Sequence, residues 1–468
     1  MERKRIYLCL AHMSEDGMEQ KYVKEAFDTN WVVPLGPNVN AFEKDLEAFA
    51  NSIDGSRFKV QGSSPETLNK RVVALSSGTA AVHLALIACG VGPSDEVIVQ
   101  SFTFCASTHP VTYLGATPVL VDSEPDTWNI DPELLEEAIK DRIAKTGKKP
   151  AAIVPVALYG MPYKADRIME IANKYGIPVV EDAAEGFGSK YKGQVLGTFG
   201  KYGVLSFNGN KMITTSGGGA LITPDDESWR EIMMYATQYR ESYPYYQHEK
   251  IGYNYRMSNI CAGIGRGQMT IVNDHLAHHK HVQKLYEELL KDVPGIHVHS
   301  QPVQGSGLMV NGEEIPVYDS NYWLCTITID PEVKVKGQEN AYKTIVTGAV
   351  GGAAGVIHAA ESAHTDCEPN ANVEAMRVAL DKAQIEARPV WKPMHKQPVY
   401  CRTSEKGKVK SEKLPSGTEC LTYDNSVAYV NGVSEALFKV GMCLPAGPYV
   451  SDDDVKYIVD TIKENIIG

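Results

Sequence analysis

Through the first two thirds of the chain, short runs of apolar and β-branched residues alternate with longer stretches of helical spacing. The short runs predict buried strands at residues 71–75, 96–100, 118–121, 152–156, 178–181, 203–207 and 219–222. Helical spacing between them predicts helices at 79–88, 132–140 and 165–174, and Asp131 followed by Pro132 is typical of a helix start. This alternation indicates an α/β fold with a mixed, mostly parallel sheet covered by helices.

The pattern changes after about residue 275, where a long polar-faced helix is predicted at 276–290, a strand at 322–329 and a last helix at 452–466. A chain of 468 residues also exceeds the usual size of one domain. We therefore expect a large domain at 1–275 that includes the N-terminal segment, and a smaller C-terminal α/β domain at 276–468. Stretches 348–354 and 403–422, rich in small or polar residues, are predicted to be inserted or mobile surface.

Composition excludes several classes of protein. The net charge of −12 provides no basic surface for nucleic acid. The apolar run near the N-terminus is too short for a signal peptide, and no apolar stretch is long enough to span a membrane, so we expect a cytoplasmic protein. Nine scattered cysteines without a C-x-x-C pair favour reduced thiols over disulfides or a zinc site, and Cys105 is interpreted as a small core residue.

Three local features carry candidate chemistry. The apolar strand before Asp182 ends on that carboxylate, and ligands gather at strand ends of open α/β sheets, although an aspartate there is more often a turn or helix cap. Lys211 lies between two predicted buried strands, in a turn rich in Asn, Ser, Thr and Gly. A lysine in such a confined site can form a Schiff base with a carbonyl compound. Most lysines in loops, however, are simply exposed to solvent.

The third feature is the turn at 75–81, Leu-Ser-Ser-Gly-Thr-Ala-Ala, which leads from a strand into a helix. Backbone N–H groups and the helix dipole converge there and favour an anion such as a phosphate, although many α/β proteins use such turns for packing alone. The order of the three features, first the phosphate turn, then Asp182, then Lys211, is what indicates a pyridoxal 5′-phosphate (PLP) site.

The whole set resembles the DegT/StrS family of PLP-dependent nucleotide-sugar aminotransferases, which have the type I, aspartate-aminotransferase-like fold. The motifs that carry the resemblance are Pro-Leu-Gly-Pro at 34–37, Ser-Ser-Gly-Thr-Ala-Ala at 76–81, Ser-Phe-Thr-Phe at 101–104, Glu-Asp-Ala-Ala-Glu at 181–185, Gly-Thr-Phe-Gly at 197–200, Ser-Phe-Asn-Gly-Asn-Lys at 206–211, Gly-Tyr-Asn-Tyr-Arg-Met-Ser at 252–258, Arg-Pro-Val-Trp-Lys-Pro-Met-His at 388–395 and Cys-Leu-Pro at 443–445.

The resemblance implies a role for individual residues. Lys211 would carry PLP as an internal Schiff base and Asp182 would pair with the pyridine nitrogen. The other implied cofactor contacts are Gly78, Thr79 and Ser206 at the phosphate, Phe104 stacked on the ring, and Glu185 near the ring hydroxyl. Asn254 would reach the phosphate of the neighbouring subunit, which implies a homodimer. Candidates for the sugar-nucleotide side are Arg388, Trp391 and His395, and a structural role for His395 is equally open.

Within the family, two runs resemble those of the enzymes that aminate UDP-4-keto sugars in the N-acetylbacillosamine pathway. They are Asn-Gly-Asn-Lys-Met-Ile-Thr-Thr-Ser-Gly-Gly-Gly at 208–219 and Trp-Lys-Pro-Met-His at 391–395. This implies L-glutamate as amino donor and a UDP-linked 2-acetamido-4-keto-6-deoxy sugar as acceptor. Other nucleotide keto sugars, linked to dTDP or GDP and aminated at C3 or C4, remain the alternative. Family members that dehydrate sugars have histidine in place of this lysine, so Lys211 argues against a dehydratase. A non-catalytic regulatory protein would be expected to lack Lys211 or Asp182, and both are present.

Two positions depart from the family pattern. Ala157 stands where relatives often have histidine before Leu-Tyr-Gly, and Tyr322 stands where relatives have arginine in Asn-Arg-Trp-Leu. Both substitutions are expected to alter contacts with the substrate.

Overall fold

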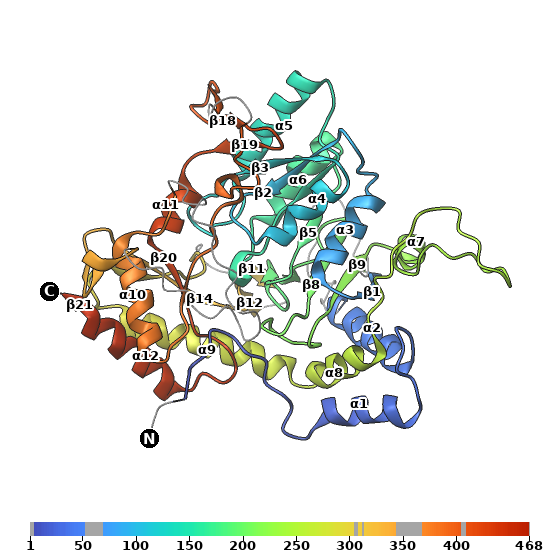
Figure 1. The fold of residues 1–468 in the computed structure, drawn as a ribbon, viewed down its shortest axis with the longest axis horizontal. Helices are drawn as coiled ribbons and strands as arrows, with labels where there is room; N and C mark the ends of the chain where they lie inside the picture. Colours follow the sequence, from blue (N-terminus) through green and yellow to red (C-terminus); the bar gives the residue numbers. More distant parts are fainter. Residues whose placement is uncertain are drawn as a thin grey trace.

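The computed structural model describes residues 4–51, 69–303, 308–310, 313–342, 367–403 and 409–467, so the stretch predicted to be flexible at 348–354 lies outside the described residues. A mixed sheet forms the centre of the larger part of the molecule (Figure 1). Its strands, in spatial order, are β17 (Lys410–Lys413), β18 (Glu419–Thr422), β19 (Val427–Val430), β3 (Thr117–Val121), β2 (Glu96–Gln100), β4 (Ala152–Val154), β5 (Val180–Asp182), β8 (Tyr202–Ser206), β9 (Gly219–Thr223) and β1 (Arg71–Leu75).

Two runs of paired strands meet between β4 and β5. Parallel bridges join Ile153 to Val179 and Val156 to Asp182, so the strand ends on both sides of this junction face the same edge of the sheet. The strands from β19 to β4 are parallel, as are β5 and β8, while β9 and β1 run antiparallel at one edge. The predicted α/β class with a mixed, mostly parallel sheet is confirmed. The strands from β3 to β8 are buried on both faces, which explains why their sequences are continuous apolar runs.

Helices cover the sheet (Figure 1). They include α3 (Gly78–Ala88), α4 (His109–Tyr113), α5 (Pro132–Thr146), α6 (Ala165–Tyr175) and α7 (Asp226–Ala236). Asp131 caps α5 by accepting hydrogen bonds from the N–H groups of Glu133 and Leu134, and Pro132 occupies the first turn, which confirms the predicted helix start. Most predicted strands lie within one or two residues of the observed ones, whereas α5 continues to Thr146, beyond its predicted end.

A second sheet, entirely antiparallel, has the order β10 (Ile296–Val298), β14 (Cys325–Ile329), β20 (Gly441–Leu444) and β16 (Arg388–Pro389). It packs with α9 (Val272–Leu290), α10 (Ala371–Lys382) and α12 (Asp452–Asn465) around a core that includes Tyr286, Ile327 and Ile458. The marked chain ends both lie beside this part of the molecule (Figure 1), and Ile6 bridges to Ile385 there. The strand predicted at 322–329 begins only at Cys325, because Tyr322 has a left-handed backbone conformation (φ 48°) that a strand cannot contain.

The stretch at 403–422 was expected to be inserted or mobile surface. Its described part contains β17 and β18, an antiparallel hairpin that continues into β19 and so extends the first sheet beside β3. These strands come from the last 60 residues of the chain, and the pairing is remote in sequence, so local pattern could not reveal it. The proposed division of the chain at residue 275 stays a prediction. Residues 410–430 lie in the predicted C-terminal domain by sequence but join the first sheet in the structure.

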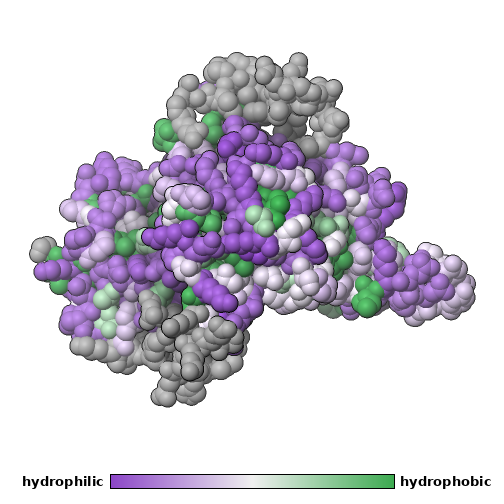
Figure 2. All heavy atoms as spheres, turned by 90° about the horizontal axis from the view of Figure 1, so that it is seen from above, coloured by the Kyte–Doolittle hydropathy of each residue, from purple (hydrophilic) through white to green (hydrophobic). Residues whose placement is uncertain are grey.

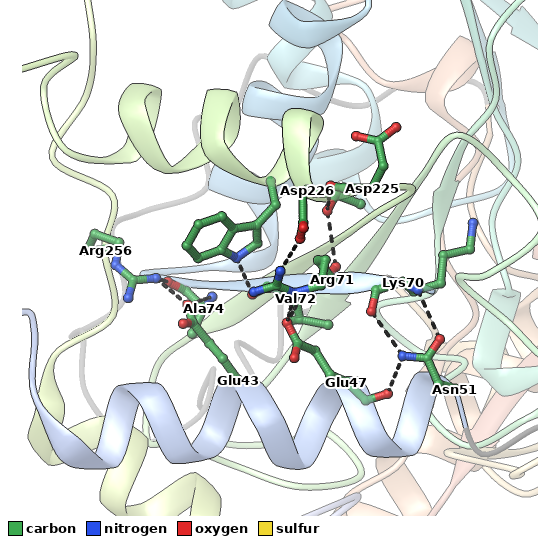
Figure 3. Close-up of polar contacts among 12 residues, drawn as sticks. Glu43, Glu47, Asn51, Lys70, Arg71, Val72, Ala74, Asp225, Asp226 and Arg256 are labelled. Atoms are coloured by element: carbon green, nitrogen blue, oxygen red, sulfur yellow. Dashed lines mark hydrogen bonds and ion pairs between the residues drawn. The ribbon is translucent and has the colours of Figure 1, made fainter. Parts of the chain in front are cut away.

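Side chains rather than another strand satisfy the outer edge of β1, which leads directly into the 75–81 turn (Figure 3). Glu43 and Glu47 on α2 (Pro37–Ala50) accept hydrogen bonds from the N–H groups of Ala74 and Val72. Arg256 pairs with Glu43 and donates to the carbonyl of Ala74. This closes an edge strand that would otherwise expose unpaired backbone groups.

A segment after α7 projects from the body of the molecule (Figures 1 and 2). It carries exposed aromatic and aliphatic side chains, namely Tyr243, Tyr245, Tyr246 and Ile251. The rest of the face seen in Figure 2 is mainly hydrophilic with small apolar areas. Within the described residues, every helix is too short or too polar to cross a membrane.

Candidate active site

A cavity of about 310 Å³ opens where β5 and β8 end and α3 begins. Its position follows the rule that ligands bind beyond the carboxyl ends of strands in open α/β sheets. The lining residues with polar or aromatic side chains are Ser76, Ser77, Thr79, Thr103, Phe104, Ser107, Asp182, Glu185, Ser206, Asn208, Asn210, Lys211, Trp323 and Trp391, and Gly78 contributes backbone.

Asp182 is buried at the end of β5 with its carboxylate on this cavity. Its Oδ2 accepts a hydrogen bond from the Ser107 hydroxyl at 2.7 Å, and Oδ1 accepts one from the N–H of Ala184 at 3.1 Å. Burial raises the pKa of Asp182, and these two hydrogen bonds and the charge of Lys211 oppose that rise. No cation among the described residues forms an ion pair with Asp182, so the site presents a buried carboxylate to a positively charged ligand atom.

Glu185 follows Asp182 by three residues and is also buried. Its Oε2 accepts a hydrogen bond from the N–H of Tyr159 at 2.7 Å, and Oε1 lies 3.4 Å from Lys211 Nζ. Tyr159 adopts a left-handed backbone conformation (φ 54°) that turns this N–H toward the carboxylate. Burial raises the pKa of Glu185, whereas the charge of Lys211 and the bond from Tyr159 lower it.

Lys211 follows β8 in a tight turn closed by its own N–H, which donates to the carbonyl of Asn208. Its Nζ lies over the indole ring of Trp323, 3.9 Å from the ring centroid. The Trp323 Nε1–H donates to the carbonyl of Asn210 at 2.7 Å, so the same side chain contacts the lysine and fixes the turn that presents it.

The start of α3, which also lines the cavity, is suited to an anion. Ser77 caps α3 by accepting a hydrogen bond from the N–H of Ala80, and the N–H groups of Gly78 and Thr79 in the first turn have no acceptor within the helix. A Cβ at Gly78 would lie 3.1 Å from the Cβ of Ser206, so glycine allows the helix end to approach the end of β8. Backbone donors, the helix dipole and the Ser206 hydroxyl therefore converge on one point.

Phe104 presents an exposed ring to the cavity, with half of its surface accessible. Trp391 lies beside it, with 5.3 Å between ring centroids, and the Trp391 N–H donates to the hydroxyl of Tyr159. An exposed aromatic ring that lines the same cavity as a buried carboxylate and a lysine is suited to stacking on a flat heteroaromatic ligand.

Three sequence-predicted residues lie outside the cavity. Asn254 is exposed and forms a bridge with Thr237 at the base of the projecting segment. Arg388 pairs with Glu386 at 2.7 Å. His395 is buried, its Nδ1 lies 2.7 Å from the Ser101 hydroxyl, and burial lowers its pKa to about 4, so in this chain it faces the end of β2 rather than the cavity.

Sequence reasoning missed Ser107 and Trp323 as members of the site. Ser107 belongs to a short 3₁₀ turn after the Ser-Phe-Thr-Phe motif, and a serine in such a turn gives no local signal. Trp323 lies in the Asn-Tyr-Trp-Leu run, and a tryptophan next to a strand gives no local signal that it contacts Lys211. Of the two departing positions, Ala157 is buried beneath Gly186, where a Cβ would meet the Ala157 Cβ at 2.7 Å.

The residues fit PLP on observations of this structure. The cavity offers an unpaired buried carboxylate for a pyridine nitrogen, an exposed ring for stacking, a lysine amine, and a helix start for a phosphate. All four groups line one cavity. This is the fold and the site of a PLP-dependent enzyme.

Comparison with known proteins gives the same class. The profile of the DegT/DnrJ/EryC1/StrS aminotransferase family matches residues 66–336. The chain is 36% identical over 459 residues to a putative pyridoxal phosphate-dependent aminotransferase, EpsN, of Bacillus subtilis, covering 98% of this chain and 95% of that protein. It is 30% identical over 458 residues to a GDP-perosamine synthase of Escherichia coli O157:H7, covering 98% of each.

Solved structures share the fold. An aminotransferase of this family from Brucella abortus superposes with a TM-score of 0.72 at 24% identity, covering 96% of this chain and 95% of that one. The PLP form of a putative sugar aminotransferase from Streptococcus pneumoniae gives 0.71 at 22% identity, covering 98% of each chain. The chain belongs to the DegT/DnrJ/EryC1/StrS aminotransferase family. It is accordingly a PLP-dependent sugar aminotransferase, which confirms the predicted cofactor and class of enzyme.

Proposed function

We propose that this enzyme transfers an amino group from L-glutamate to C4 of a UDP-linked 2-acetamido-4-keto-6-deoxy sugar, giving a UDP-4-amino sugar for glycan biosynthesis in the cytoplasm. The observation that carries the transaminase chemistry is the meeting of Asp182, Glu185 and Lys211 at one cavity. The choice of a UDP sugar rests on the resemblance of residues 208–219 and 391–395 to the N-acetylbacillosamine enzymes.

When bound, PLP supplies an electron sink for the negative charge that develops at the carbon losing its proton. Asp182 would hold the pyridine nitrogen in its protonated state, because a buried carboxylate without an ion-pair partner favours a positive charge beside it. Gly78, Thr79 and Ser206 would bind the phosphate, and Phe104 would stack on the ring. Glu185 would lie near the ring hydroxyl.

Lys211 Nζ has two roles in the proposal. It would hold the cofactor covalently at rest, and after substrate binding the free amine would take the proton from the substrate carbon and deliver it to the cofactor. The nearby Glu185 Oε1 and Trp323 ring orient Nζ toward the cavity. Arg388, Trp391 and His395 were candidates for the sugar nucleotide; of these only Trp391 lines the cavity, so it is the one retained for substrate contact.

We also propose a homodimer in which Asn254 reaches the neighbouring subunit's phosphate site. Asn254 is exposed, and its flanking residues are fixed: the carbonyl of Tyr255 accepts a hydrogen bond from the N–H of Ser76, and Arg256 pairs with Glu43. The segment is therefore rigid while the Asn254 side chain is available to a partner. Equilibrium sedimentation and the loss of PLP affinity in Asn254→Ala test this assignment.

Another nucleotide keto sugar is the second candidate, since relatives differ in substrate. The E. coli O157:H7 relative is a GDP-perosamine synthase, and a Pseudomonas aeruginosa relative, 36% identical over 260 residues, is a UDP-2-acetamido-2-deoxy-3-oxo-D-glucuronate aminotransferase. Incubation with glutamate and a panel of UDP-, GDP- and dTDP-linked keto sugars, followed by NMR of the products, separates the candidates. Preference for a GDP sugar or for amination at C3 would overturn the UDP-4-keto assignment.

The role of Lys211 has its own test. The purified protein with PLP is expected to absorb in the visible region, and Lys211→Ala should abolish that band. Lys201→Ala, which changes an exposed lysine outside the cavity, is the matched control and should keep it. A band that persists unchanged in Lys211→Ala would contradict the assignment.

A further inference from the structure

Two buried histidines on α9 are connected to the residues that flank the lysine and its indole partner. His275 and His279 are four residues apart and therefore lie on the same face of the helix. The Nδ1 of His275 lies 3.1 Å from the carbonyl oxygen of Met212, the residue after Lys211. The Nδ1 of His279 lies 3.0 Å from the carbonyl oxygen of Tyr322, the residue before Trp323.

Both bonds have a fixed direction. A carbonyl oxygen only accepts hydrogen bonds, so Nδ1 carries the proton in each histidine. Burial lowers the pKa of His275 and lowers that of His279 to about 3, so both rings are neutral at physiological pH and their Nε2 atoms lack a hydrogen-bond partner within the described residues. Each ring therefore acts as a neutral donor to one backbone carbonyl.

The carbonyls of Met212 and Tyr322 lie next to the two residues of the Lys211–Trp323 contact, one beside each residue. Lys211 Nζ lies over the Trp323 ring at 3.9 Å, and Trp323 donates to the carbonyl of Asn210, so the turn and the indole are already joined at one point. The histidines join each of them separately to α9, a helix of 19 residues that packs in the core of the second sheet. Helix α9 therefore supports both sides of the contact between Lys211 Nζ and the Trp323 ring.

The backbone at Tyr322 shows that this support is needed. Tyr322 has φ 48°, a conformation that costs a non-glycine residue energy and persists only where surrounding contacts hold it. Its N–H donates to the Ser320 hydroxyl at 3.0 Å, its own hydroxyl accepts from the N–H of Gln301 at 3.2 Å, and its carbonyl is held by His279. Tyr322 directly precedes Trp323, whose ring lies against Lys211 Nζ.

We infer that His275 and His279 are positioning residues that hold the Trp323 ring and the Lys211 amine in contact, so that the ring face stabilises positive charge at Nζ. This rests on the proposed role of Lys211 as the cofactor lysine. Neither histidine lines the cavity, so their effect is transmitted through Met212 and Tyr322. Cation–π contacts of this kind are worth enough to move a pKa by about half a unit to one unit.

The test compares His279→Leu, which removes the donor, with His279→Asn, which keeps an N–H donor near Nδ1. His278→Asn is the matched control, because His278 lies between the two positions in sequence but interacts with the 447–450 segment instead. In the PLP-bound protein, the pH midpoint of the visible band should fall by about half a unit to one unit in His279→Leu and be largely restored in His279→Asn. His275→Leu and His275→Asn should show the same contrast.

A double variant separates positioning from general loss of structure. Trp323→Leu should lower the midpoint by a similar amount, and adding His279→Leu to it should lower it no further, because both changes remove the same contact. Additive shifts, or an unchanged midpoint in His279→Leu, would overturn the inference. A wild-type band that does not depend on Lys211 would instead count against the proposed function.

A measurement without cofactor tests the positioning role of the two histidines separately from the proposed cofactor role of Lys211. In the apoprotein, His279→Leu should increase amide deuterium uptake in peptides covering residues 320–324, and His275→Leu should do so in peptides covering 208–213, whereas His278→Asn should leave both at wild-type levels. Unchanged uptake in both leucine variants would refute the positioning role, whatever the outcome with PLP.

Discussion

Ser107 donates its hydroxyl hydrogen bond to Asp182 Oδ2 at 2.7 Å, and both side chains are buried at the floor of the cavity. The Ser107 oxygen also lies 2.8 Å from the Thr103 hydroxyl, so the carboxylate is the end of a short chain of hydroxyl groups. This chain fixes the orientation of the carboxylate before any ligand is bound. A preoriented carboxylate is expected to bind a pyridine nitrogen more tightly than a mobile one.

Ser107→Ala should weaken PLP binding, because it removes a hydrogen bond to a buried charged group. Such bonds contribute about 1.5–3 kcal/mol, which corresponds to a roughly 10- to 150-fold rise in Kd measured by fluorescence titration. Thr108→Val is the control: Thr108 is the neighbouring buried residue, and its hydroxyl has no hydrogen-bond partner within the described residues. Equal Kd values for the two variants would contradict a role for the Ser107 hydroxyl.

Asp182→Asn should have opposite effects on the apoprotein and on PLP binding. Burial raises the pKa of Asp182 above its value in the unfolded chain, so its ionised form destabilises the folded apoprotein above the folded-state pKa. The penalty disappears below the unfolded-state pKa, where the group is protonated in both states. The variant should therefore have a higher Tm than wild type near neutral pH, and the difference should vanish on acidification.

The same substitution should weaken PLP binding about 100-fold or more, because a neutral amide cannot pair with a protonated pyridine nitrogen in a buried site. Calorimetry of the apoprotein across pH and titration with PLP measure the two effects separately. A lower Tm at neutral pH together with unchanged affinity would show that Asp182 acts only as a structural residue.

Gly78→Ala should reduce affinity for the phosphate end of the cofactor. The added Cβ would lie 3.1 Å from the Cβ of Ser206 and push the start of α3 away from the end of β8. We expect at least a tenfold rise in the Kd for PLP and a similar effect on inorganic phosphate as a competitor. Gly92→Ala, where the nearest atom would lie at 4.0 Å, should bind PLP as the wild type does.

Arg256→Met should destabilise the protein by about 3 kcal/mol, because it leaves the buried carboxylate of Glu43 without its cation at the edge of β1. Asp226→Asn breaks a more exposed pair with Arg71 at the same strand and should cost less than about 0.5 kcal/mol. Denaturant unfolding of both variants gives the comparison. Similar losses in the two variants would mean that burial of the Glu43–Arg256 pair contributes nothing specific.

The strands and their ends could be predicted well from sequence because they depend on neighbouring residues. Strand β1 and strand β2 have the predicted bounds, since a run of β-branched residues between polar turns specifies a buried strand locally. The positions of Asp182 and Lys211 beyond strand ends follow from the same local pattern. Their meeting with the 75–81 turn was expected because strand ends of one sheet share an edge.

The sequence by itself determined the α/β class, the three elements of the PLP site and, through its motifs, the aminotransferase family. Only the tertiary structure decided that residues 419–430 return to the first sheet beside β3, that His395 faces Ser101 instead of the cavity, and that Trp323 covers Lys211. The physical reason is the range of the interactions. Helix and strand periodicity act between neighbours, whereas these contacts join residues more than a hundred positions apart, whose proximity depends on how the whole chain packs.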